Sequence, residues 1–242
     1  LPIYNNYSCY FAYFPHYSYG RHLNLVAECA AVAPSPSLPG LVVTSLGQSL
    51  DGREMDYIRV GKGSTNAWII HRQHPGESMA EYYAEGLLAR LLGLGSSGDG
   101  INNDDVRRQI LERYALHIIP CMCPDGAVRG HLRTNAVGAN LNREWATVKE
   151  DYDAPTLQRS PEVYHVLKQM ELHPPDLFLD IHGDEELPVN FLAGSQGTPP
   201  WYDERSDKRV EQLHGAFLAA YVRSNSDMQP SIGYTQIGRA HV

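Results

Sequence analysis

The sequence predicts an α/β sandwich around a largely parallel or mixed sheet. Strand-like apolar runs alternate with helix-like segments along the chain, and this alternation is typical of the fold class. One intervening segment, residues 78–92, has the period of a helix with one buried stripe. The 242 residues, 43% hydrophobic and 20% charged, suffice for one large domain with a substantial core.

The first forty residues differ in composition from the rest. Residues 1–19 hold six Tyr and two Phe, and alternating aromatic residues favour strands. We interpret them as the tail of a preceding β element. The Pro-rich run from Ala30 to Gly40 predicts a connector. The chain therefore divides into the end of a β domain, residues 1–40, and a main domain, residues 41–242.

The main domain begins with a predicted hairpin. Its strands cover residues 41–46 and 56–60, with a turn between Ser49 and Gly52. A further strand is expected at residues 67–71, the apolar run AWIIH.

The segment 78–92 carries the clearest helical pattern. Its apolar residues recur at the spacing of one helix face: Ala80, Tyr83, Ala84, Leu87, Leu88, Leu91 and Leu92. The helix is expected to end at Gly93. Ser78 is expected to cap its N-terminus, with Glu81 completing a capping box.

Shorter elements follow this helix. We expect helices from Asp104 or Asp105 through Tyr114, from Ser160 onwards, and over residues 203–223. The expected strands are Leu116–Pro120, Asp176–His182 and Asn190–Ala193. Residues 121–156 form a long, polar, Gly-rich excursion, and loops of that length in compact domains are usually functional or disordered.

The loop before the first helix holds His74 and Glu77, three residues apart. An imidazole and a carboxylate at this spacing can turn toward one point, and such ligands suit zinc. The intervening Pro75 and Gly76 force a tight turn at a strand's C-terminal end, where open α/β sheets place their sites. A capped helix start is the alternative interpretation of the same residues.

His182 ends a predicted strand and precedes Gly183, which lets other groups approach closely. With His74 and Glu77 it makes a His₂Glu set that leaves one position open, the pattern of catalytic zinc. The alternative is a histidine that is only hydrogen-bonded at a strand end.

The excursion carries the run GHLRTNAVGANLNREW, from Gly130 to Trp145. Its Arg133 and Arg143 are bidentate donors that suit a carbonyl oxygen or a carboxylate. Because arginines in polar loops are usually just solvated, they indicate no function by themselves.

Taken together, these segments resemble the zinc metallocarboxypeptidases, in particular the cytosolic carboxypeptidase branch. The matching blocks follow the family order over residues 41–200: SLGQSLDGREMDYIRVG, RQHPGESMAEYYAEGLL, PDGAVRGHLRTNAVGANLNREW, SPEVYHV and LDIHGDEELPVNFLAG. The resemblance implies a three-layer α/β/α sandwich around a mixed, mostly parallel sheet, preceded by the tail of a small β domain. It also implies zinc-dependent hydrolysis of the C-terminal peptide bond of peptides or protein tails.

The resemblance assigns His74, Glu77 and His182 to one zinc ion. Asn140 would be the outer partner of the first zinc histidine, at a position where many relatives have Asp. An amide oxygen can accept the imidazole N–H there, but less strongly than a carboxylate.

The remaining roles come from the same resemblance. Arg133 would polarise the scissile carbonyl, and Asn142 and Arg143 would hold the substrate's C-terminal carboxylate. Cys123 stands where the family has asparagine, which removes an amide expected to brace the loop. No acidic residue follows Asp227, so the family's general-base glutamate, its last strand and part of the specificity pocket are expected to be missing.

Charge and cysteine content argue against several classes of protein. The net charge of −8 argues against a nucleic-acid partner. No apolar run approaches the roughly 18–20 residues of a membrane helix, so no membrane partner is expected. The four cysteines make no zinc-finger or disulfide framework, which indicates reduced thiols and a cytoplasmic protein.

Two alternative functions remain open. One is an aspartoacylase-like amidohydrolase of the same fold, against which the long match to the cytosolic branch argues. The other is a noncatalytic zinc- or peptide-binding module. The expected loss of the general base supports the second alternative, while the complete ligand set and the arginines oppose it.

Overall fold

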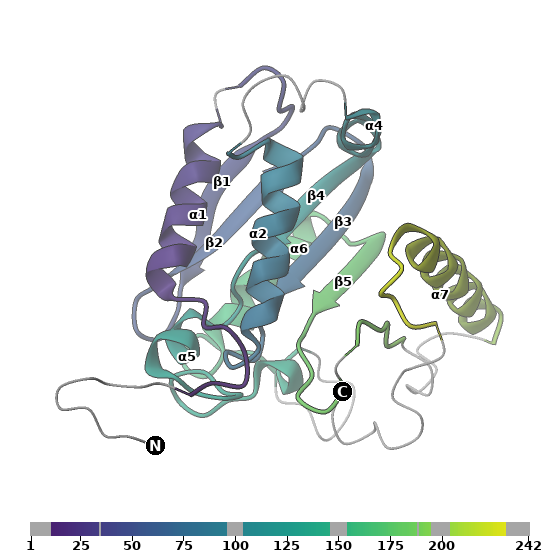
Figure 1. The fold of residues 1–242 in the computed structure, drawn as a ribbon. Helices are drawn as coiled ribbons and strands as arrows, with labels where there is room; N and C mark the ends of the chain where they lie inside the picture. The colour runs from purple at the N-terminus through teal and green to yellow at the C-terminus, as the bar shows by residue number, and fades with distance from the viewer. Residues whose placement is uncertain are drawn as a thin grey trace, which may run out of the picture. The chain divides into compact units, whose positions relative to one another are not determined.

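A five-stranded mixed sheet organises the larger part of the chain (Figure 1). Its strands, in spatial order, are β1 (Val42–Gln48), β2 (Glu54–Val60), β4 (Tyr114–Ile119), β3 (Thr65–His71) and β5 (Leu177–Ile181). The pairings β1/β2 and β2/β4 are antiparallel, whereas β4/β3 and β3/β5 are parallel. The prediction of a mixed sheet is confirmed, with the parallel pairings gathered on the β3 side.

The computed structural model describes residues 11–33, 35–95, 104–145, 154–187, 189–194 and 204–230. Two compact units are present, Leu1–Gly183 and Asp184–Val242, and the sheet belongs to the first. The five strands lie where the sequence predicted them, with bounds that differ by no more than two residues.

Helices cover both faces of the sheet and make the three layers. On one face, α1 (Tyr19–Ala31), α2 (Ser78–Leu92) and α4 (Asp105–Arg113) share a core with the strands. Helix α6 (Pro161–Leu172) packs against the opposite face. In Figure 1, α1 and α2 lie in front of the sheet.

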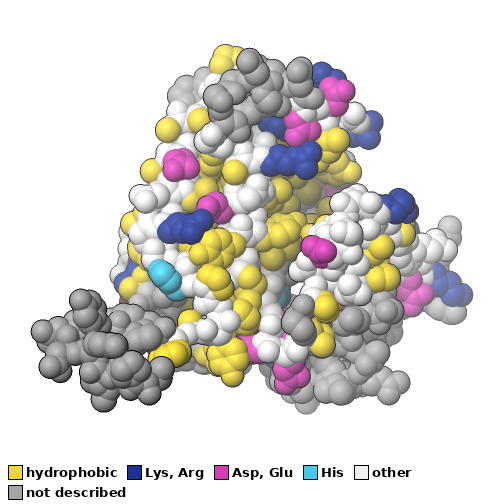
Figure 2. Space-filling model, viewed as in Figure 1, with side chains coloured by type: hydrophobic (Ala, Val, Ile, Leu, Met, Phe, Trp, Pro, Cys, Tyr) yellow, Lys and Arg dark blue, Asp and Glu magenta, His cyan; other side chains and the backbone are white. Residues whose placement is uncertain are grey.

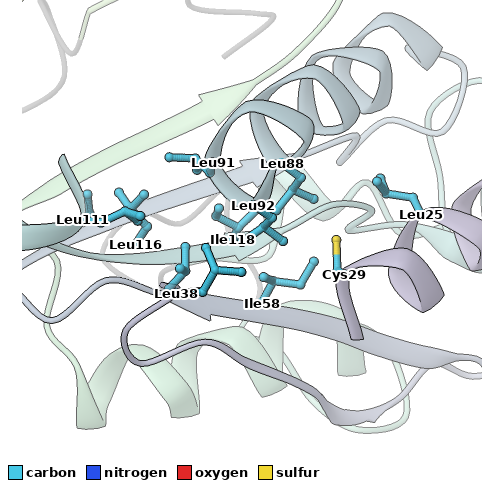
Figure 3. Packing of buried hydrophobic residues seen from close by; sticks show 12 residues of the cluster. Leu25, Cys29, Leu38, Ile58, Leu88, Leu91, Leu92, Leu111, Leu116 and Ile118 are labelled. Carbon is cyan, nitrogen blue, oxygen red and sulfur yellow. The ribbon is translucent and has the colours of Figure 1, made fainter. Parts of the chain in front are cut away.

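The two cores follow from the alternation of side chains along each strand. Ile58 contributes to the core under α1 and α2, and its neighbour Tyr57 contributes to the core under α6. Figure 3 shows the first core, where Leu88 and Leu92 of α2 lie near Ile118 of the sheet. Burying a leucine or isoleucine side chain of this kind contributes about 1.5–3 kcal/mol.

Helix α1 was not expected from the sequence. Ser18 caps it, because its Oγ accepts the Arg21 N–H at 3.2 Å, and Leu25 and Cys29 bury one stripe against the sheet. Residues 11–18 form no strand, and residues 1–10 lie outside the described part of the chain. The aromatic content of residues 1–19 favoured strands, but residues 11–18 have no regular secondary structure and lead into α1. The domain division at residue 40 stays a prediction.

Helix α2 has the predicted bounds, but its predicted capping box is wrong. Glu77 occupies the N-cap position, and the Ser78 hydroxyl donates to the Pro15 carbonyl at 2.7 Å. Glu81 is fully buried and contacts His22 and Arg72 instead. A tertiary ion pair thus replaces the local cap.

In its described residues, the excursion after β4 contains the short helix α5 (Pro124–Arg129) and the 3₁₀ helix η1 (Leu141–Arg143). Cys29, Cys121 and Cys123 are buried free thiols, while Cys9 lies outside the described residues.

The second unit contains α7 (Glu204–Ser224), one residue from its predicted bounds. The strand expected at Asn190–Ala193 is wrong, because only a single bridge between Asn190 and Met228 forms there. Among the described helices, α7 included, none combines the length and apolarity needed to span a membrane.

Candidate functional site

The loop between β3 and α2 is held on several sides. Arg72 has a positive φ of 56°, which is uncommon for a residue with a side chain. Its guanidinium offsets that strain by donating to the carbonyls of Pro75 and Tyr17, at 2.9 and 3.0 Å, and to Glu81. The loop therefore has one fixed conformation, as a preorganised site requires.

Gly76 brings this loop against the long excursion. Its N–H donates to the Leu132 carbonyl at 2.9 Å, and a Cβ at position 76 would lie only 2.8 Å from that oxygen. Only glycine permits this approach without displacement of the backbone. Arg133 follows Leu132 in the chain. Its backbone therefore lies close to the loop that carries His74 and Glu77.

The three predicted metal ligands converge. His74 Nδ1 lies 2.7 Å from Glu77 Oε1, and His182 Nδ1 lies 2.9 Å from Glu77 Oε2. One ligand atom from each residue falls within 4.8 Å of the others. His74 and Glu77 are buried and His182 is half-buried. Two imidazole nitrogens and a carboxylate around one point make a donor set that suits zinc.

The sheet register explains the convergence. In the parallel pair β3/β5, His71 lies opposite Ile181. The residues that follow each strand therefore leave the same edge of the sheet together. Glu77 completes the connection, because its Oε2 also accepts the Gly183 N–H at 2.9 Å.

Each histidine uses its other ring nitrogen for an outer partner. His74 Nε2 donates to Asn140 Oδ1 at 3.1 Å, as the sequence analysis expected of Asn140. His182 Nε2 donates to Asp180 Oδ2 at 2.8 Å. Since each Nε2 carries a proton in these bonds, each Nδ1 lone pair can face the shared centre.

Asp180 was missed in the sequence analysis. The signal was available, because a residue two positions before His182 on a strand lies on the same face of the sheet. Gln73 was missed as well, and it bonds Asp180 on one side and the Trp145 indole on the other.

Charge distribution in the site favours ion pairing. Burial opposes ionisation of Glu77, but hydrogen bonds with His182 and His74 outweigh it and lower the pKa of Glu77 to about 2. Burial likewise opposes protonation of His182, yet its bonds with Asp180 and Glu77 raise its pKa to about 10. The carboxylate is therefore ionised at neutral pH and attracts positive charge to this point, whether protons or a metal cation.

The predicted substrate residues lie on the same excursion. Asn142 and Arg143 belong to η1, whose N-cap is Asn140, and the Asn142 N–H donates to Asn140 Oδ1 at 3.1 Å. Arg143 donates to the Asn142 carbonyl at 2.9 Å. Asn140 thus joins the segment with the candidate carboxylate anchors directly to the first predicted metal ligand.

The neighbouring Asp125 braces the loop that contains Cys123. Asp125 is fully buried and accepts hydrogen bonds from the Ser49 hydroxyl and the Arg53 guanidinium, both at 2.7 Å. The Asp51 N–H adds a third bond at 2.9 Å. Asp125 therefore connects α5 to the turn of the β1/β2 hairpin. The effect of cysteine in place of asparagine at position 123 stays a prediction.

A known protein family matches most of this chain. The family model described as zinc carboxypeptidase matches residues 35–238. The chain belongs to the zinc carboxypeptidase family. An uncharacterized protein of Zymomonas mobilis is 43% identical over 225 residues, which cover 93% of this chain and 52% of that protein. Cytosolic carboxypeptidase 4 of Homo sapiens is 27% identical over 209 residues, 77% of this chain and 17% of that protein.

A solved structure gives the same assignment. The metallo-carboxypeptidase from Burkholderia cenocepacia is 41% identical, with a TM-score of 0.74, over 90% of this chain and 53% of that one. The chain thus spans about half the length, or less, of these relatives. The three-layer fold and the family predicted from the sequence are both confirmed.

Proposed function

We propose that this chain carries the zinc site and the carboxylate-binding segment of a metallocarboxypeptidase, which removes the C-terminal residue of peptides or protein tails. The convergence of His74, Glu77 and His182 within 4.8 Å carries the proposal. Family membership supports the reaction class, and the cytosolic carboxypeptidases among the relatives support a cytoplasmic location.

The donor set fits one zinc ion. Two imidazoles and one carboxylate leave a fourth position open, as catalytic zinc sites require. The outer bonds of Asn140 and Asp180 hold the imidazoles with their Nδ1 atoms toward the centre. When bound, zinc would act as a Lewis acid and lower the pKa of a water molecule to about 7.

The chain's own residues would bind and orient the substrate. Asn142 and Arg143 would hold the terminal carboxylate, because a planar guanidinium matches a carboxylate in two parallel hydrogen bonds. Arg133 would donate to the scissile carbonyl oxygen as negative charge develops there. The Asn140 amide keeps the anchors beside the metal ligands.

A peptide chain end is the partner that this chemistry favours. The net charge of −8 opposes binding to nucleic acid. Figure 2 agrees for the face it shows, where Lys and Arg side chains are interspersed with Asp and Glu. The expectation that the general-base glutamate lies outside residues 1–242 stays a prediction.

Zinc content tests the metal assignment. The chain purified without added metal and then titrated with zinc should bind one ion, and His74→Ala should abolish stoichiometric binding. His173→Ala is the matched control, because His173 is the C-cap of α6 and belongs to no predicted ligand set. Equal zinc content in wild type and His74→Ala would show that the assignment is wrong.

Peptide binding tests the carboxylate anchor. Arg143→Ala should weaken the binding of a peptide with a free C-terminus by about 1.5–3 kcal/mol, the worth of a charge-assisted contact. Isothermal titration of the zinc-loaded chain measures this loss. The C-terminally amidated peptide is the control, and it should bind wild type and variant alike. An equal loss with the amidated peptide would exclude Arg143 as the anchor.

A further inference from the structure

The segment Asn140–Trp145 is connected at both ends to the histidines of the metal site. At its start, Asn140 Oδ1 accepts from His74 Nε2 and from the Asn142 N–H, both at 3.1 Å. At its end, the Trp145 indole N–H donates to Gln73 Oε1 at 2.6 Å. Gln73 immediately precedes the first predicted ligand.

A continuous hydrogen-bonded chain leads from Trp145 to the other histidine. Gln73 Nε2 donates to Asp180 Oδ2, and the same oxygen accepts from His182 Nε2 at 2.8 Å. His182 Nδ1 then faces Glu77 at 2.9 Å. Trp145 and His182 are thus connected through two intermediate side chains.

Donor and acceptor chemistry permits only one direction for this series of hydrogen bonds. An indole N–H can only donate, so the Gln73 amide must turn its oxygen to Trp145 and its NH₂ group to Asp180. Asp180 Oδ2 accepts from the Gln73 NH₂ group, and His182 Nε2 donates to the same oxygen. The Nδ1 lone pair is then left for the metal centre.

Burial strengthens this constraint. Gln73 is 1% exposed, and the second oxygen of Asp180, Oδ1, is buried with no hydrogen-bond partner among the described residues. A buried polar group that loses its partner destabilises the fold, because its lost contacts with water are no longer replaced. Rotation of the Gln73 amide would break both of its bonds at once, so the alternative orientation is disfavoured.

We propose that Gln73 and Trp145 are positioning residues for the metal site. Through Asp180 they hold His182 with Nδ1 directed at the metal, and they couple metal binding to the segment that presents Asn142 and Arg143. Occupation of the metal site and the placement of the carboxylate anchors would then support each other. This inference rests on the proposed zinc function.

Zinc affinity of two variants tests the proposal. Gln73→Met removes both amide bonds at similar volume, and Trp145→Phe removes the indole donor but keeps an aromatic ring. Each should weaken zinc binding roughly tenfold, measured by competition with a chromogenic chelator. Tyr57→Phe is the control, because it also deletes a buried hydrogen bond, the 2.6 Å contact with His117, in which no predicted ligand takes part.

A spectroscopic measurement distinguishes coupling between the metal site and Trp145 from general destabilisation of the fold. The indole N–H resonance of Trp145 should shift when zinc is added to wild type and should lose most of that shift in Gln73→Met. The indole of Trp68, which donates to the His173 carbonyl at 2.8 Å, is an internal reference expected to stay in place.

The outcomes are distinguishable. Wild type that binds no zinc would overturn the proposed function and this inference with it. Wild type that binds zinc, with both variants as tight as wild type or no weaker than Tyr57→Phe, would overturn the positioning role alone.

Discussion

Besides Glu77, four carboxylates are buried and show how single residues accommodate charge in the fold: Glu81, Asp125, Glu144 and Glu162. The first three have charged partners. Glu81 pairs with Arg72, Asp125 with Arg53, and Glu144 with Arg159. Each of these pairs offsets the cost of burying a charge.

Glu162 is the exception among these carboxylates. Its recorded side-chain partner is the Asn135 amide, at 3.3 and 3.5 Å from the two carboxylate oxygens. Burial raises the pKa of Glu162 to about 7, and the nearby charges of Asp125 and Glu144 add to the effect. Asn135 in turn accepts the N–H groups of Val137 and Ala139, so Glu162 supports the excursion that carries the candidate substrate residues.

Glu162→Gln should therefore change stability in a pH-dependent way. Because the folded pKa lies above the unfolded value, the favourable contribution of protonated Glu162 is complete at acidic pH and is lost as pH rises through about 7. The glutamine does not titrate. At about pH 8 the variant should be more stable than wild type, on the order of 1–3 kcal/mol, with little difference at about pH 4.

Urea denaturation at the two pH values measures this difference. Glu171→Gln is the control, since Glu171 is exposed and pairs with Lys168 one turn away. A variant that is equally shifted at both pH values, or less stable at the higher one, would contradict the assigned protonation.

At the scale of elements, one histidine of α1, His22, contacts both the sheet and α2. His22 Nδ1 lies 2.6 Å from Glu81 Oε1, and His22 Nε2 lies 2.9 Å from Asp56 Oδ2 on β2. Glu81 also accepts a hydrogen bond from Arg72, in the loop between β3 and α2 that carries His74 and Glu77. The helix that the sequence analysis did not expect thus supports the site through a shared buried carboxylate.

His22→Gln should remove a pH-dependent part of this attachment. Burial disfavours the charged imidazole, but the bonds with Asp56 and Glu81 prevail and raise its pKa to about 9. Because the folded pKa is raised above about 6.5, this stabilisation is complete below about pH 6.5 and is lost as pH rises through about 9. The variant should be less stable than wild type at about pH 6, on the order of 2–3 kcal/mol, and the difference should shrink at about pH 10.

The free energies of unfolding of the two zinc-loaded proteins provide the measurement. The comparison at each pH cancels the titrations that both proteins share. A constant difference from about pH 6 to about pH 10 would mean that His22 contributes packing without charge.

At the scale of the whole molecule, the site depends on the order of strands in the sheet. β3 and β5 are neighbours although more than a hundred residues separate them, and their parallel register brings the residues after both strands to one edge. The excursion closes against the same edge through the Gly76 and Asn140 contacts. Three distant segments therefore form one site.

Much of this protein was determined by local sequence. The stripe of helix 78–92 predicted α2 to the residue, and the short apolar runs predicted all five strands of the sheet. His74 and Glu77 could be predicted as a pair because a three-residue spacing in a tight turn brings their side chains together. The strand-end position of His182 made it a third candidate, and the resemblance of ordered blocks to zinc carboxypeptidases added Asn140. The geometry joins both residues to that pair.

Only the tertiary structure decided the rest. The aromatic run before α1 favoured strands, and the helix follows from burial of Leu25 and Cys29 against a sheet formed later in the chain. The path from Trp145 through Gln73 to Asp180 joins segments that are 72 and 107 residues apart. Periodicity reports which face of an element is apolar, but it carries no information about which distant polar groups will meet. Sheet order and register determine those meetings, because they decide which ends of the strands lie side by side.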